Sequence, residues 1–359
     1  MSTTRIATVL IALYTALFLF ADFFAVADPA AIDPSLPYLP PEAIRFTSSS
    51  GRFHLRPLLV RRHPIAGQFA AYSQQQPALI PLRFFVFTAS PDDPSTRHLR
   101  ICAISDGAAH FLGTDEFGRD VWSRLVYGGR LTLLISLSAA LAATLVALAV
   151  GIVAGYSGPL ADSALMRLVE ACMAVPWLYL LLAVRALLPL RSPPIVAAAV
   201  CALVMAAIGW ARPARILRGA AHAARQSAYV TLARATGASP WHIARWHLLP
   251  ALAPLALTQF TVLVPQFIAG EIALSYFGLG VTEPLVSWGD MLAAAQHLSA
   301  IVQYPWLMAP IWAMIPLFFA IHIFADRSST RSPLTLSSVT RHWYKLPRQK
   351  VQGESPVRF

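Results

Sequence analysis

Charged residues are scarce in this sequence. They make up 13% of its 359 residues, whereas hydrophobic residues make up 57%. A soluble domain is usually about one quarter charged, so the composition excludes an ordinary soluble protein. Lysine is almost absent, because only Lys345 and Lys350 are lysines among the 28 basic residues. Neither follows a glycine, so the chain has no Gly-Lys-Ser/Thr element and therefore no P-loop for nucleotide phosphates.

Cysteine and histidine give no sign of a disulfide framework or a metal site. The chain has three cysteines, no Cys-x-x-Cys pair and no His-Glu-x-x-His element, and its ten histidines are scattered. Cys172 and Cys201 fall inside apolar runs. We expect the cysteines to be small buried hydrophobic residues, and we expect no bound metal.

Six apolar runs are long enough to cross a bilayer. They cover residues 6–27, 131–155, 164–190, 193–211, 251–274 and 303–325. These runs predict an all-α membrane protein with six transmembrane helices. The first run follows Arg5 and ends in Ala25-Val26-Ala27, which resembles a signal peptide with its cleavage site. Its length favours a retained transmembrane helix over residues 1–27.

Basic residues near the ends of the runs predict the orientation. They gather in the loop 212–250 and in the tail 326–359, and short loops rich in arginine and lysine stay in the cytoplasm. With six spans, both termini are then cytoplasmic and residues 28–112 lie outside. This outer segment is rich in proline, and its stretches 79–88 and 98–104 are β-like. We expect a small, partly β insertion there, and we attribute the net charge of +11 to topology and loop contacts rather than to nucleic acid.

Residues 229–250 are polar and arginine-rich, although they lie between two apolar runs. Gly237 suits the left-handed residue that ends one helix, Ser239 can cap a second, and Pro240 suits its first position. Pro250 suits the start of the next apolar helix in the same way. The pattern predicts a helical hairpin on which a cytoplasmic partner docks. It also resembles a DNA-binding helix-turn-helix, but its second helix runs into a membrane span, so we expect no nucleic acid.

A further segment precedes the core of transmembrane helices that we expect over residues 131–325. Residues 113–130 predict an amphipathic helix at the outer membrane surface, with Asp115 and Glu116 at its start. Ionisable groups in spans are functional candidates. Glu170, Glu271 and the polar Gln259 are therefore candidates for the solute pathway or for a structural role.

Two other classes of function fit parts of the sequence. Gly155-Tyr156-Ser157-Gly158 matches the GxSG motif of intramembrane serine proteases, with His322 in the last span as a possible base. A turn at Pro159 and the short length of the motif argue against this interpretation. A secondary transporter or channel would show internal repeats and polar groups at mid-membrane, and neither is evident here.

The hairpin resembles the EAA loop of ABC-importer permeases. Ala233, Gly237 and the pair Leu249-Pro250 occupy the family's positions. Thr231 stands where the family has a glutamate, and Leu232 stands where it has an alanine. The glutamate of the family is not catalytic, and Thr231 can still cap the helix weakly.

Two more blocks are similar to the dipeptide/oligopeptide/nickel branch of that family, second-permease type. One is 113–130 and the other is 271–291, which contains FGLG and SWGDML. The outer motif of the first block consists of Gly113, Thr114, Asp115, Gly118, Arg119 and Asp120.

The resemblance implies a non-enzymatic subunit of a bacterial inner-membrane importer. It implies a heterodimer with a second permease, two ABC ATPase subunits that bind the ATP, an extracytoplasmic solute-binding protein, and no cofactor in this chain. Peptides are the solute that it implies first, with nickel or another small solute left open. The residues that it implies for ATPase coupling are Tyr229, Thr231, Ala233, Arg234, Gly237, Ala238, Leu249 and Pro250.

Overall fold

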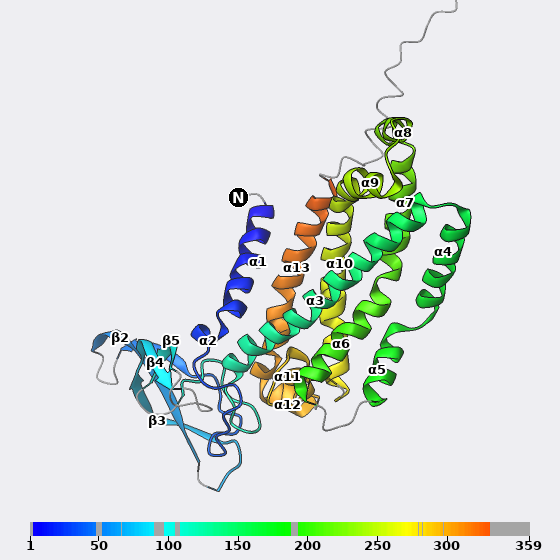
Figure 1. Ribbon diagram of the computed structural model, residues 1–359. Helices are drawn as coiled ribbons and strands as arrows, with labels where there is room; N and C mark the ends of the chain where they lie inside the picture. The colour runs from blue at the N-terminus through cyan, green and yellow to red at the C-terminus, as the bar shows by residue number, and fades with distance from the viewer. Residues whose placement is uncertain are drawn as a thin grey trace, which may run out of the picture.

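The chain folds into a helical bundle with a group of β-strands at one end. The computed structural model describes residues 3–47, 52–65, 67–89, 97–104, 108–187, 193–278, 280–281, 283–296 and 298–330. The tail beyond residue 330, predicted to be basic and cytoplasmic, lies outside these residues. Figure 1 shows the strands at one end of the bundle and helices α8 and α9 at the other. We call these the strand end and the hairpin end.

The strands form two antiparallel sheets. β1 (Ala43–Thr47), β2 (Phe53–Pro64) and β3 (Tyr72–Pro81) form one sheet in that order, and β4 (Arg83–Ala89) pairs with β5 (Arg97–Ala103). The β-like stretch 79–88 is divided between β3 and β4, and the stretch 98–104 corresponds to β5. Leu59, Leu82 and Cys102 are buried together with Val26, so this small core joins the strands to the segment after the first helices.

Three helical stretches of the described chain are long and apolar enough to cross a membrane. They are α3 (Val121–Tyr156), Pro240–Tyr276 and Pro305–Ala325. The middle stretch joins α9 (Pro240–Ile243), a π-helical turn (Ala244–Leu248) and α10 (Leu249–Tyr276). The last joins a 3₁₀ turn (Pro305–Met308) to α13 (Ala309–Thr330). Helices α6 (Pro194–Gly209) and α7 (Ala211–Arg225) form a fourth such stretch if the pair, bent by 40°, counts as one.

The first and third predicted spans correspond to shorter helices. α1 (Thr3–Leu19) has 17 residues and is followed by the short α2 (Ala21–Phe24). The third predicted span is divided between α4 (Pro159–Ala174) and α5 (Trp177–Leu187). The break falls at Val175, which is extended, because the residue before a proline avoids the helical conformation.

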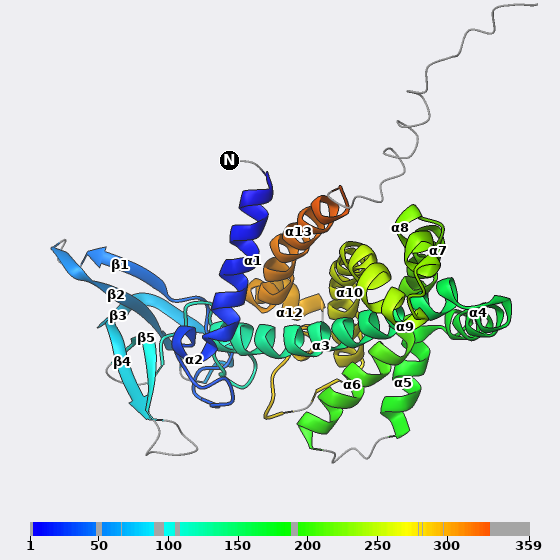
Figure 2. The ribbon, with the colours of Figure 1, turned by 45° about the horizontal axis from the view of Figure 1, so that its top comes forward.

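Helix α3 runs through the middle of the bundle (Figure 2) and packs closely on α7. A Cβ atom on Gly151 would lie 2.7 Å from Cβ of Leu217, and one on Gly155 would lie 2.6 Å from Cβ of Ala221. The two helices can therefore approach this closely only because these positions are glycine. Residues 212–225, predicted as part of a loop, thus form a packed helix instead.

The first helix is tied to the rest of the bundle. The Tyr14 hydroxyl donates to the carbonyl oxygen of Ala313 in α13 at 2.8 Å. The backbone N–H groups of Val26 and Ala27 both donate to Oγ of Ser123, at 3.1 and 3.0 Å. Because Ala25, Val26 and Ala27 are buried, the segment that resembles a cleavage site belongs to the packed structure.

Candidate functional site

Residues 229–250 form a helical hairpin, as the glycine, serine and proline positions in this segment predict. Helix α8 (Ala228–Ala235) is terminated by Gly237, which lies two residues after its last residue and has φ of +85°. The N–H of Gly237 donates to the carbonyl of Arg234, and the N–H of Ala238 donates to that of Ala233, both at 3.0 Å. This is a Schellman motif, which requires a left-handed residue. Ser239 then caps α9 by accepting from the N–H of His242 at 3.2 Å.

The second helix of the hairpin does not stop at Pro250. The chain continues from α9 through the π-helical turn into α10 as one stretch of 37 residues. Pro250 lies in the first turn of α10 and donates no backbone hydrogen bond. The π-helical turn just before it allows the helix to continue past this position. The hairpin is therefore a rigid extension of a spanning helix rather than a separate unit.

One face of the hairpin is buried, and the other exposes large apolar side chains. Val230, Ile243 and Leu248 are fully buried against the bundle. On the outside, Leu232 is 66% exposed and Trp241 is 73% exposed. Exposed apolar groups held on a fixed backbone are typical of an interaction surface. Tyr229, Leu232, Trp241, Trp246 and Leu249 are the large hydrophobic residues exposed there, and we call them the hairpin surface.

The residues predicted for coupling lie on or beside this surface. Thr231 does not cap α8, because its hydroxyl donates back to the carbonyl of Ser227 at 3.1 Å from inside the helix. Arg234 donates from Nε to the Tyr156 hydroxyl at 3.2 Å and lies over its ring, which ties the hairpin to the end of α3. Gly237 and Pro250 are exposed, and Ala233 and Ala238 are half-buried.

The outer motif forms a buried turn instead of an interfacial helix. Helix α3 begins only at Val121, and its cap is Asp120, which accepts from the N–H of Ser123 at 2.7 Å. Arg119, Asp120 and Arg124, which would lie on the polar face of the predicted amphipathic helix, are all at most 4% exposed. These polar side chains can be buried because each forms hydrogen bonds or ion pairs within the protein. Gly113 and Gly118 have positive φ values, and Thr114 pairs with Asp120 across the turn.

Two of these partners, Glu283 and Asp290, come from the second family-like block, residues 271–291. Arg119 donates to Asp115 from Nε at 2.6 Å and also meets Glu283. Arg124 donates to Asp290 of α11 (Trp288–Ala293) at 2.8 Å. The outer motif therefore holds the segment 283–290, which precedes α12 (Leu298–Gln303), at the strand end of the bundle.

The two glutamates predicted as pathway candidates lie in different surroundings. Glu271 is 1% exposed and accepts hydrogen bonds from Thr132 at 3.0 Å and Ser275 at 2.8 Å. These bonds join α10 to α3, and Glu271 is not among the residues that line the cavity described below. Glu170 is exposed on α4 and also lies outside the cavity described next.

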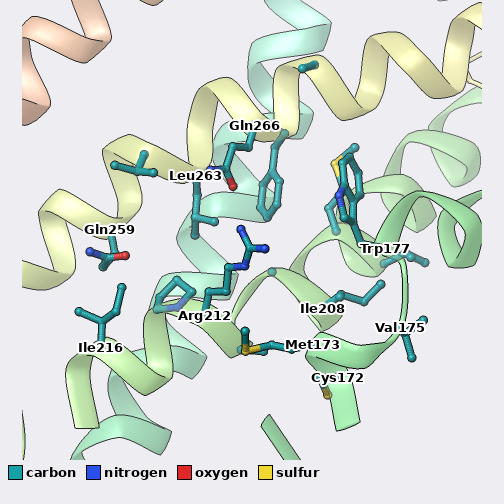
Figure 3. A pocket seen from close by; sticks show the side chains of 18 residues that line it. Cys172, Met173, Val175, Trp177, Ile208, Arg212, Ile216, Gln259, Leu263 and Gln266 are labelled. Atoms are coloured by element: carbon teal, nitrogen blue, oxygen red, sulfur yellow. The ribbon is translucent and has the colours of Figure 1, made fainter. Parts of the chain in front are cut away.

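A cavity of about 560 Å³ lies between α4–α5, α6–α7 and α10. Figure 3 shows Arg212 projecting into it beneath Leu263 and Gln266, with Trp177 to the right and Met173 below. Gln259 lines it as well. Cys172 is half-buried at its wall rather than fully buried as predicted.

Sequence reasoning missed most of this cavity. Arg212 was assigned to a cytoplasmic loop because it follows an apolar run. A usable signal existed, since Gln259 and Gln266 are seven residues apart and therefore share one face of a helix. Nothing in the sequence places Trp177 opposite that face.

Comparison with known protein families identifies the family of this chain. Residues 147–332, more than half of the chain, match the family of binding-protein-dependent transport system inner membrane components. The chain belongs to this family. It is similar to the dipeptide transport system permease protein DppC of Bacillus subtilis, with 35% identity over 221 residues, 61% of this chain and 67% of that protein. It is also similar to the oligopeptide transport system permease protein OppC of Bacillus subtilis, with 31% identity over 249 residues, 69% of this chain and 79% of that protein.

The chain is therefore an ABC-importer permease, a multi-pass inner-membrane protein that works in a complex with other subunits. It is not an enzyme, which removes the protease interpretation. In agreement, Ser157 is the C-cap of α3, and its carbonyl accepts from Arg225 at 3.2 Å. Within the described residues, no hydrogen bond joins Ser157 to His322.

Proposed function

We propose that the permease imports short peptides into the cytoplasm and is driven by separate ATPase subunits that dock on residues 229–250. The observation that carries this proposal is the hairpin surface, which exposes Leu232 and Trp241 on a capped, rigid backbone. The relatives DppC and OppC are named for dipeptide and oligopeptide transport. The sequence has no P-loop, so we assign ATP binding to the partner subunits and no cofactor to this chain.

The proposed topology has six crossings. They are α1, α3, α4–α5, α6–α7, α9–α10 and α13. Arginines cluster near the hairpin end, which favours a cytoplasmic position for that end. The first residues of α1 and the last turns of α13 lie at the same end (Figure 1), which supports cytoplasmic termini. The strands then lie outside, where we propose that a solute-binding protein delivers the peptide.

The proposed mechanism is alternating access. A second permease completes the solute pathway, and two ATPases close on ATP and push on the hairpin. Because α9 is continuous with α10 and Arg234 ties α8 to α3, movement of the hairpin reaches two central helices directly. Coupling of this kind needs an element with two conformations, whose equilibrium is shifted both by ATP at the ATPases and by solute in the pathway. In this proposal the helix bundle is that element.

A photo-crosslinking amino acid at Leu232 or Trp241 tests the docking. In membranes that contain the whole transporter, we expect both positions to capture an ATPase subunit. The matched control is Phe53, which is 70% exposed in β2 at the strand end, and it should capture none. If neither hairpin position captures an ATPase while the complex is intact, the proposed coupling is wrong.

A further inference from the structure

Arg212 places a cation inside the cavity. It lies at the start of α7, next to the bend after α6, and its side chain projects between α5 and α10 (Figure 3). Among the described residues, no carboxylate lies within ion-pair distance of it. An ionisable group in a spanning segment is costly and usually serves a function.

Other arginines of the same helix are engaged elsewhere. Arg218 forms a two-pronged pair with Asp162 at the start of α4, with 2.5 Å between Nη2 and Oδ2. Arg225 donates to the Ser157 carbonyl and lies over the Tyr156 ring. Those two side chains fasten α7 to its neighbours, whereas Arg212 contributes to no such contact and is exposed to the cavity.

The rest of the lining fits a ligand with one anionic group and an apolar body. Among the described residues, no aspartate or glutamate lines the cavity, and its other polar side chains include the amides of Gln259 and Gln266 from one face of α10. Trp177, Met205 and Phe267 supply apolar surface. The volume of about 560 Å³ falls in the range of small-molecule sites, roughly 300–1,000 Å³.

We propose that this cavity binds the solute through a carboxylate, and that Arg212 is the group that recognises it. The guanidinium can donate two parallel hydrogen bonds to a carboxylate. The two glutamine amides can bind the peptide groups that follow, and the apolar wall accepts small side chains. The inference rests on the proposed function, because it makes the C-terminal end of a short peptide the ligand of this cavity.

The thiol of Cys172 provides a reporter in the natural chain, because it lies at the cavity wall. The purified full-length protein is treated with N-ethylmaleimide, and modification of Cys172 is followed by peptide mass spectrometry. Trialanine, with its free carboxylate, should slow the modification. Trialanine amide should need at least about tenfold higher concentration for equal protection, since it lacks the charge-assisted bonds.

Arg212→Gln should remove the difference between the two probes. Arg215→Gln is the matched control, because Arg215 is three residues away on the same helix, is exposed and does not line the cavity. It should keep the difference. Both variants should react at the wild-type rate without probe, which shows an intact fold. Equal protection by the two probes, no protection by either, or a persistent difference in Arg212→Gln would overturn the inference.

Uptake separates this inference from the proposed function. Vesicles that contain the complete transporter are assayed for ATP-driven uptake of trialanine. If the wild type takes up trialanine and Arg212→Gln does so equally well, only the role of Arg212 fails. If the wild type takes up no peptide in the presence of ATP and its partners, the proposed function itself fails.

Discussion

Arg124 in α3 donates a hydrogen bond to Asp290 in α11, with 2.8 Å between Nη2 and Oδ2, across 166 positions of sequence. The arginine side chain is 3% exposed and the aspartate side chain 29%. The pair joins the start of the central helix to the segment at the strand end. The loss of stability when this pair is broken depends on burial, because a buried charge that loses its partner remains desolvated.

We therefore predict that Arg124→Met strongly destabilises the permease. Breaking one side of a buried pair costs about 3 to 5 kcal/mol, because the remaining charge is uncompensated. The matched control on the same helix is Arg130→Met. Arg130 pairs with Asp22, but these side chains are 50% and 46% exposed, so the loss should stay under about 1 kcal/mol. Stability is measured by thermal unfolding in detergent. Equal losses of stability in the two variants would contradict the prediction.

The loss in Arg124→Met should depend on pH. Burial raises the pKa of Asp290, and the charge of Arg124 counteracts that rise. Without Arg124, the pKa in the folded state moves further above the unfolded value of about 3.9. A carboxyl with a raised folded pKa destabilises the fold above its unfolded pKa and has no effect once it is protonated in both states. The deficit should be largest at neutral pH and shrink as the pH falls toward about 4.

Local sequence signals predicted the hairpin, because its geometry depends on neighbours in the chain. Gly237, Ser239 and Pro240 each act within a few residues, so their pattern is sufficient. The outer motif shows the opposite case. Its amphipathic spacing fits an interfacial helix, but the partners of Arg119 and Arg124 lie beyond residue 280. No local rule reveals that a polar face will be buried against such a distant segment.

Hydropathy located the spans better than it located their ends. α3 extends ten residues before the predicted start at 131, because Asp120 caps it inside the protein rather than at a membrane surface. Beyond 211, hydropathy falls while the helix continues, since Leu217 and Ala221 pack on the glycines of α3. The cavity was missed for the same reason, as Arg212 belongs to that extension.

A substitution at Gly237 tests whether the hairpin angle transmits force. Gly237→Val should leave the ATPase bound but cut transport-linked ATP hydrolysis several-fold. A left-handed conformation costs a residue with a side chain about 1–2 kcal/mol, and the Schellman motif would be lost. Gly237→Asn should retain most of the activity, because asparagine tolerates this conformation.

Gly219→Val is the control for Gly237→Val. At both glycines an added Cβ meets nothing within 4 Å, but only Gly237 has a positive φ. The control variant should therefore hydrolyse ATP as the wild type does. Hydrolysis that is unchanged in Gly237→Val, or reduced equally in both variants, would refute the role of the hairpin angle.

Thiol reactivity provides a further prediction. Burial raises the pKa of Cys102 to about 11 from 9.0, which lowers its thiolate fraction near neutral pH about a hundredfold. Cys172, at the cavity wall, is half-buried. N-ethylmaleimide should therefore modify Cys172 first and reach Cys102 only after unfolding. Rapid modification of Cys102 in the folded protein, measured by mass spectrometry, would show that the strands open readily.

The hydroxyl of Thr132 is the bridge between α3, α10 and α11. It donates to Oε2 of Glu271 at 3.0 Å and accepts from the N–H of Trp288 at 3.1 Å. Thr132→Val keeps the shape but leaves two buried polar groups without this partner. An unsatisfied buried group costs about 1–3 kcal/mol, so we predict a clear fall in thermal stability. Thr132→Ser should restore most of the loss, because it keeps the hydroxyl.

The same substitution elsewhere on α3 isolates the effect of the bridge. Thr144 is also buried, but its hydroxyl donates only to the carbonyl of Ala140, four residues earlier, at 2.7 Å. That carbonyl already accepts a helical hydrogen bond, so Thr144→Val removes a redundant contact and leaves no group unsatisfied. It should change the unfolding temperature little. If Thr144→Val and Thr132→Val lower the unfolding temperature equally, then the loss is not specific to the bridge, and Glu271 does not depend on Thr132.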